Sequence, residues 1–217
     1  GSRLQFANDG TLFVSLGEGF SFMKDAQDPM NTHGTIVRIN TDGSIPADNP
    51  FADGEAGAPA VWSYGHRNVQ GLYYDAATGT LYETEHGPKG GDELNLVTPG
   101  TNYGWPEITY GVNYDGTIIT NKTEAEGMAQ PLTYWVPSIA PSGLVMLTSD
   151  VYPGWKGDLF TGGMNGPAGL ELTRIDMENG EVVGKQSLFD GEYPIRDVVQ
   201  GPDGHLYVAT KDFDGIF

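Results

Sequence analysis

The sequence contains no cysteine among its 217 residues. Disulfide bonds, thiolate metal sites and cysteine nucleophiles are therefore excluded, and cysteine usage says nothing about the redox compartment. Basic residues are also scarce, since 11 Lys and Arg stand against 29 Asp and Glu, for a formal net charge of −18. Because phosphate backbones and anionic lipids are bound by clustered Lys and Arg, this balance argues against nucleic acid and anionic membranes as partners.

Long apolar runs are missing too, so no segment predicts insertion into a membrane. The first residues, Gly1 to Arg3, lack the apolar core of a signal peptide, and a strand-like segment follows them at once. We therefore expect that a preceding part of the protein has been removed. An acidic chain without cysteine is compatible with a periplasmic or secreted location.

Turn residues, in contrast, are abundant, with 32 Gly and 14 Pro that punctuate short apolar segments. A turn followed by apolar alternation occurs four times, and the four copies share Leu12, Leu81, Leu159 and Leu206. The 47 residues from Leu159 to Leu206 approach the length of a four-stranded propeller blade. A second similarity, between GTIVRINTDG at 34–43 and GLELTRIDMENG at 169–180, predicts an outer hairpin that recurs.

Helix-forming stretches are nearly absent, and the one near 123–128 is too short and too polar to pack. The sequence therefore predicts an all-β fold, a β-propeller of about four blades that forms a single domain over 1–217. An open propeller would leave strand edges exposed, so we expect this domain to be part of a larger propeller.

The stretch from Trp62 to Pro106 concentrates the residues that carry chemistry. Arg67 and Asn68 follow an aromatic segment, and two carboxylates, Asp92 and Glu93, follow the glycine pair 90–91. Glycines let the backbone approach a ligand, an arginine fork binds carboxylates or phosphates, and calcium takes carbonyl and carboxylate oxygens. The stretch predicts an anion site beside a hard cation.

The segments WSYGHRNVQGL, TEHGPKGGDELNLV and GTNYGWP in this stretch, together with GTIVRINTDGSIPADNPF before it and IRDVVQGPDGHLYVATKD after it, resemble the soluble aldose sugar dehydrogenases of the glucose/sorbosone dehydrogenase family. These enzymes use pyrroloquinoline quinone (PQQ), and their fold is a six-bladed β-propeller. The resemblance covers nearly the whole chain, with the motifs in the family's order. It implies that the chain corresponds to roughly the last two-thirds of such a propeller.

The resemblance implies that Arg67, Asn68, Tyr114 and Arg196 bind the quinone cofactor. An arginine fork and an amide donor match the carboxylate edge of this planar molecule. Without the family resemblance, packing in a core is the better explanation for Tyr114, and an ion pair with Asp197 or another acid is the alternative for Arg196.

For metal ions, the resemblance implies that the main-chain carbonyls of Gly87 and Pro88 hold a calcium ion beside the cofactor. Glu93 and the main-chain oxygen of Tyr103 match a second, structural calcium site. Alternatively, Gly87 and Pro88 form an ordinary turn, and Glu93 is a solvated loop carboxylate.

Three departures from the family are visible. The family's proton-abstracting histidine would lie just before Gly1, so Glu18, which matches the acid that orients it, has no partner to orient, and we expect the chain alone to be nearly inactive. His33, His66, His86 and His205 do not match that position. Asn165 stands near a family lysine and Pro194 at a family arginine, which places cofactor affinity in question.

The leading hypothesis is a calcium-dependent quinoprotein that oxidises the anomeric carbon of aldoses to lactones and passes electrons to an external acceptor. The alternative is a non-catalytic, calcium-binding propeller that binds glycan or protein. A calcium-dependent lactonase is a third possibility, although no cluster of Asp and Asn around one axis supports it.

Overall fold

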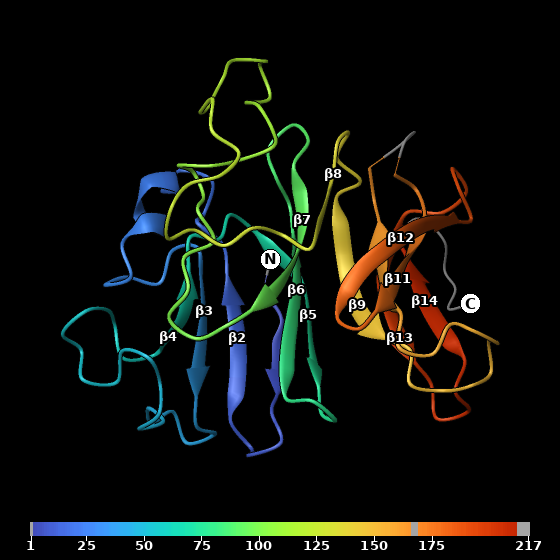
Figure 1. Cartoon of the computed structure of the whole chain (residues 1–217), viewed down its shortest axis with the longest axis horizontal. Helices are drawn as coiled ribbons and strands as arrows, with labels where there is room; N and C mark the ends of the chain where they lie inside the picture. Colours follow the sequence, from blue (N-terminus) through green and yellow to red (C-terminus); the bar gives the residue numbers. More distant parts are fainter. Residues whose placement is uncertain (1, 166–168, 212–217) are drawn as a thin grey trace.

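The computed structural model describes residues 2–165 and 169–211, and it consists almost entirely of antiparallel strands (Figure 1). Three sheets have four strands each and one has two. The strands are β1 (Leu4–Phe6), β2 (Leu12–Leu16), β3 (Thr35–Ile39) and β4 (Val61–Tyr64) in the first sheet, β5 (Val69–Asp75), β6 (Thr80–Glu85), β7 (Asp92–Val97) and β8 (Thr133–Trp135) in the second, β9 (Pro141–Met146), β10 (Leu159–Gly163), β11 (Leu172–Glu178) and β12 (Glu181–Leu188) in the third, and β13 (Ile195–Gln200) and β14 (Leu206–Thr210) in the fourth.

The repeats seen in the sequence correspond to equivalent strands. Each of the four shared leucines lies at or next to the start of the second strand of a sheet, in β2, β6, β10 and β14. The second similarity falls on β3 and β11, the third strands of their sheets. Tight turns with a glycine in the left-handed region, such as Gly10 at φ 82°, connect strands that pair in register.

The sheets follow one another with their first strands side by side. β5 lies beside β9, β9 beside β13, and β1 against β5. Apolar side chains fill the space between neighbouring sheets, with Phe13 and Leu72 between the first two, Leu94 and Leu159 between the second and third, and Phe160 with Val198 between the third and fourth. This stacking of antiparallel sheets face to face is the arrangement of propeller blades.

Regular helix is limited, in the described ranges, to the short 3-10 helix η1 (Met23–Gln27). The segment 123–128 is irregular, in agreement with its weak helical signal. No helix among the described residues has the length and apolar character needed to cross a membrane. The prediction of an all-β fold is thus confirmed.

Candidate cofactor and metal site

Arg67 and Asn68 lie in the connection between the first and second sheets, where β4 ends and β5 begins. The guanidinium of Arg67 is buried, and its Nη1 donates to the carbonyls of His86 (3.0 Å) and Gly87 (2.7 Å). Its Nη2 donates to the Tyr114 hydroxyl at 3.4 Å, while its Nε has no hydrogen-bond partner among the described residues. A buried, unpaired donor of this kind is suited to an anionic ligand.

Two buried carboxylates fix the backbone around Arg67. Glu85 Oε2 accepts hydrogen bonds from the amides of Arg67 (2.5 Å) and Asn68 (3.2 Å). Asp92 Oδ1 accepts the amide of Gly87 at 2.9 Å. A Cβ at Gly87 would meet the Gly91 carbonyl oxygen at 2.2 Å, so this close approach requires glycine.

Asp92 also holds a second loop in place. Its Oδ2 accepts Ser138 Oγ (2.6 Å) and the amides of Ile139 (2.8 Å) and Ala140 (2.9 Å). Burial raises the pKa of Asp92, although these donors favour its charged form. The carboxylate thus connects the Gly87–Pro88 turn to the residues that precede β9.

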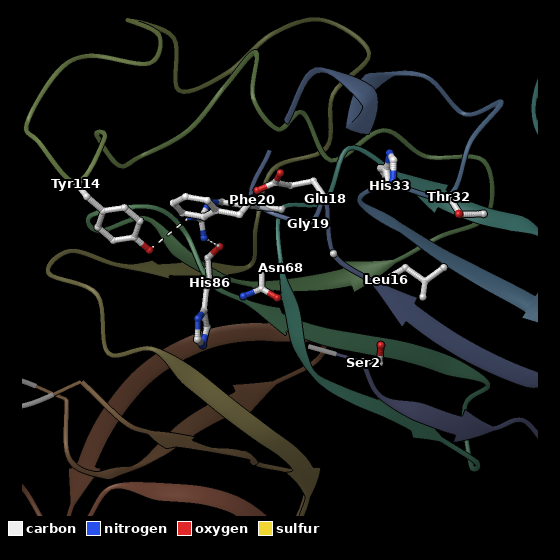
Figure 2. Close-up of a pocket in the computed structure, with 12 residues that line it drawn as sticks. Ser2, Leu16, Glu18, Gly19, Phe20, Thr32, His33, Asn68, His86 and Tyr114 are labelled. Atoms are coloured by element: carbon white, nitrogen blue, oxygen red, sulfur yellow. Dashed lines mark hydrogen bonds between the residues drawn. The ribbon is translucent and has the colours of Figure 1, made fainter. Parts of the chain in front are cut away.

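A cavity of about 540 Å³ opens on one side of Arg67 (Figure 2). Asn68, His86, Tyr114 and the loop that carries Glu18 and Phe20 lie around it, and Thr32 and His33 form its far side. Glu18 is buried in the wall, where its Oε2 accepts the Phe22 amide at 3.3 Å and its own amide donates to the Arg67 carbonyl at 2.9 Å. The loop of Glu18 is therefore tied directly to Arg67.

A second cavity, of about 650 Å³, shares His86 and Tyr114 with the first. Gly87, Pro88, Lys89 and Asn165 are among its lining residues. The two cavities thus lie on either side of His86, at the start of the 86–88 turn.

The remaining predicted cofactor residues differ in position. Tyr114 is 61% exposed and stacks on Phe20 with ring centroids 6.3 Å apart, so it lines the cavities and is not packed in a core. Arg196 is exposed on β13, its Nη1 lies 3.3 Å from Met164 Sδ, and it does not line either cavity. The acid beside it, Asp197, pairs with Arg3 at 2.9 Å instead.

The model of the Glucose / Sorbosone dehydrogenase family matches residues 1–217. The chain belongs to the glucose/sorbosone dehydrogenase family.

Relatives and solved structures agree with this assignment. The aldose sugar dehydrogenase YliI of Escherichia coli is 42% identical over 220 residues, which cover 99% of this chain and 58% of that protein. A crystal structure of a glucose dehydrogenase superposes with a TM-score of 0.92 at 40% identity, over 99% of this chain and 62% of the other. The PQQ-bound aldose sugar dehydrogenase of Streptomyces coelicolor gives a TM-score of 0.75 at 32% identity, over 98% of this chain and 56% of the other. The chain thus spans about three fifths of the length of these relatives.

A buried polar cluster lies beneath Arg67 in this member of the family. Glu83 and Glu85 on β6 are directly opposite Asn95 and Glu93 on β7, and His66 packs against them. His66 Nδ1 lies 3.6 Å from Glu83 Oε1 and 3.4 Å from Glu85 Oε1, and Asn95 Nδ2 donates to Glu83 Oε1 at 2.7 Å. Buried acceptors remain unpaired among the described residues, namely Glu83 Oε2 and Asn95 Oδ1.

Burial and the close contacts within the cluster shift the pKa values of its residues. Burial lowers the pKa of His66, but the hydrogen bonds that its imidazole donates to Glu83 and Glu85 outweigh burial and raise that pKa to about 9. Ser63 Oγ lies 2.9 Å from His66 Nε2. The spacing resembles a serine, histidine and acid triad, but the raised pKa favours the charged form of His66, which has no lone pair to take the serine proton.

The same cluster has the composition of a cation site. Burial and the charge of Glu85 raise the pKa of Glu93 well above its ordinary value, which favours its protonated form when no cation is bound. A small cavity of about 10 Å³, near the least that can hold one water, is lined by Glu85, Glu93 and Tyr103 among others. The Tyr103 hydroxyl is engaged with Leu96 and Thr98, so any contact of this residue with an ion falls to its main chain.

The sequence analysis did not predict the buried cluster of Glu83, Glu85 and His66, nor that Asp92 would hold two loops together. A signal was present, because Glu83 and Glu85 alternate along one strand and Glu93 and Asn95 along the next. Residues two apart on a strand share a face, so paired strands with this pattern bring four polar side chains together.

Proposed function

We propose that the chain is the cofactor-binding part of a calcium-dependent quinoprotein that oxidises the anomeric carbon of aldoses to lactones, with PQQ as the hydride acceptor. The observation that carries this proposal is Arg67, a buried residue with an unpaired Nε that lines the 540 Å³ cavity and donates to the Gly87 carbonyl. A carboxylate-bearing ligand would satisfy that donor, and the family includes a PQQ-bound aldose sugar dehydrogenase.

Each residue has a distinct part in the proposal. Arg67 and Asn68 bind the carboxylate and carbonyl groups of the quinone, and Tyr114 packs against it and holds Nη2 of Arg67. The carbonyls of Gly87 and Pro88 hold a calcium ion, which requires the Gly87 oxygen to accept from Arg67 with one lone pair and to face the ion with the other. When bound, PQQ supplies the electron-accepting carbonyl that calcium polarises.

A second calcium ion belongs in the buried cluster with Glu93 and Tyr103. Its support is the unpaired oxygens of Glu83 and Asn95 and the small cavity between Glu85 and Glu93. A divalent cation would replace the protons that neutralise the cluster without it.

The proposal assigns no general base to His66 or His86. His66 is buried and its pKa is raised to about 9, whereas burial lowers the pKa of His86 and its Nε2 donates to the Pro141 carbonyl at 2.7 Å. Glu18 would orient a base supplied from elsewhere in the protein. A periplasmic or secreted location and an external electron acceptor complete the proposal.

The test is a titration with calcium and PQQ in the presence of an artificial electron acceptor and a panel of aldoses, on the protein in its natural full length. Arg67→Lys keeps the charge but loses the fork, so we expect quinone affinity to fall at least about tenfold. Arg196→Lys is the matched variant, and because Arg196 does not line the cavities we expect a smaller effect.

Two results would count against the proposal. Aldose turnover that is absent at saturating calcium and PQQ, without change in the quinone spectrum, removes the oxidoreductase assignment. Tight calcium binding without quinone binding would favour the alternative, a propeller that binds glycan or protein, which the uncharged Asn165 and Pro194 permit.

A further inference from the structure

His33 and Asp25 form a fixed pair on the far side of the first cavity from Arg67. His33 Nδ1 lies 2.9 Å from Asp25 Oδ2, and the His33 amide donates to Asn31 Oδ1 at 2.7 Å. The imidazole also stacks on Phe22, with ring centroids 4.6 Å apart and an interplanar angle of 15°. An aromatic contact and a charged acceptor therefore hold this ring in one orientation.

The orientation leaves Nε2 of His33 available. In the tautomer whose Nδ1–H donates to Asp25, Nε2 presents a lone pair, and no described residue bonds to it. His33 and its neighbour Thr32 line the cavity (Figure 2). The free acceptor is thus placed where a hydroxyl group of a ligand could meet it.

Exposed aromatic side chains surround the same cavity. Phe20 is 71% exposed and Tyr114 is 61% exposed, and both line it. Phe20 also has a φ of 67°, a conformation that is costly for a bulky residue and that recurs at ligand-binding positions. Aromatic faces beside a few convergent polar groups suit a sugar, whose C–H faces are apolar and whose edges carry hydroxyls.

We propose that His33 is a specificity-determining residue of the sugar site, whose Nε2 accepts a hydrogen bond from a hydroxyl of the aldose while Phe20 covers a face of the sugar ring. Asp25 and Phe22 are positioning residues, since they act through the His33 ring. The inference rests on the proposed function for the identity of the ligand class, a neutral aldose.

The first measurement needs no variant. The imidazole signals of the four histidines are followed by NMR while an aldose is added to the protein without PQQ. We expect the His33 signals to shift in a saturable way and those of His205 to stay in place. His205 is the internal control because it too pairs with an aspartate, Asp203 at 3.2 Å, and does not line the cavity.

The second measurement compares variants at saturating PQQ and calcium. His33→Ala should raise KM for the aldose about 3- to 10-fold, the value of one hydrogen bond, and leave quinone affinity unchanged. His33→Gln, whose amide reaches the position of Nε2, should recover part of the loss, whereas His33→Asn, whose amide reaches only the position of Nδ1, should not. His205→Ala should behave as the unmodified protein.

The outcomes separate this inference from the proposed function. Unshifted His33 signals at high sugar, or an unchanged KM in His33→Ala with intact PQQ-dependent turnover, overturns the inference alone. Shifted His33 signals in a protein that does not bind PQQ support the sugar site and overturn the oxidoreductase assignment alone. Thermal melting of each variant verifies that it is folded.

Discussion

Replacing Asp92 by asparagine tests whether one buried carboxylate holds the proposed calcium turn. Asp92 is 0% exposed and accepts four hydrogen bonds, one on Oδ1 from Gly87 and three on Oδ2 from the 138–140 loop. Asparagine keeps the shape but has one oxygen, so its amide must face either the Gly87 amide or the three donors of the loop.

The orientation that costs less free energy keeps the three loop donors paired and leaves the Gly87 amide facing the asparagine NH₂ group in a buried space. The variant then loses one hydrogen bond to a charged acceptor and leaves buried groups unpaired, for which we expect a loss of about 2–4 kcal/mol in the free energy of unfolding. Because Gly87 is then free to move, calcium affinity should fall as well. Urea unfolding followed by tryptophan fluorescence measures the first effect, and calorimetric titration the second.

Asp42→Asn is the matched control. Asp42 Oδ1 accepts the Ser44 amide and hydroxyl in an exposed turn, and an asparagine oxygen can accept the same bonds. Its urea midpoint should match that of the unmodified protein. If Asp92→Asn also unfolds at the midpoint of the unmodified protein with the same denaturant dependence, the four hydrogen bonds of Asp92 do not stabilise the fold.

Three further outcomes are expected. Because the pKa of Glu93 is raised by burial and by Glu85, the unliganded fold should lose stability as the pH rises through that pKa. Glu93→Gln should remove this loss, so in EDTA at pH 8 it should melt above the unmodified protein, and it should gain less stability from calcium than the unmodified protein does. Phe160→Ala empties a fully buried site and should cost about 3–5 kcal/mol in urea unfolding. Gly34→Ala, at φ 63° with the His66 carbonyl oxygen 2.1 Å from the added Cβ, should lower the melting temperature and disturb the His33 loop, with a normal melt contradicting the geometry.

The strands and their equivalence could be read from the sequence because they depend on local signals. Leu12, Leu81, Leu159 and Leu206 each follow a turn, and apolar alternation then specifies a strand with one buried face. The sequence also singled out Arg67 and Asn68, and the structure places both at one cavity; their cofactor role stays a prediction. Arg196 shows the limit of such a match, because the motif fixes its strand but not where its flexible side chain points.

What the sequence left open depends on contacts between distant segments. Asp92 and Ser138 are 46 residues apart, and no local pattern indicates that the carboxylate of one closes the loop of the other. The pair of His33 and Asp25 depends on a loop with little regular structure, so its role was equally invisible. Burial of polar residues could not be predicted either. The sequence allows Glu93 to be a solvated loop carboxylate, but in the structure it lies opposite Glu85 on paired strands.

The side chain of Glu85 alone joins the buried cluster to the proposed cofactor residues, and this connection affects ion binding. Glu85 faces His66 with Oε1 and accepts the amides of Arg67 and Asn68 with Oε2. A cation bound beside Glu85 and Glu93 would therefore order the backbone that presents Arg67, and by linkage PQQ would raise calcium affinity by the same factor by which calcium raises PQQ affinity. Quinone dissociation constants measured with and without calcium give that factor. In Glu93→Gln, which alters the cluster but not the Gly87 carbonyl, we expect the factor to shrink; an unchanged factor would show that the buried cluster is a separate structural site with no influence on the cofactor.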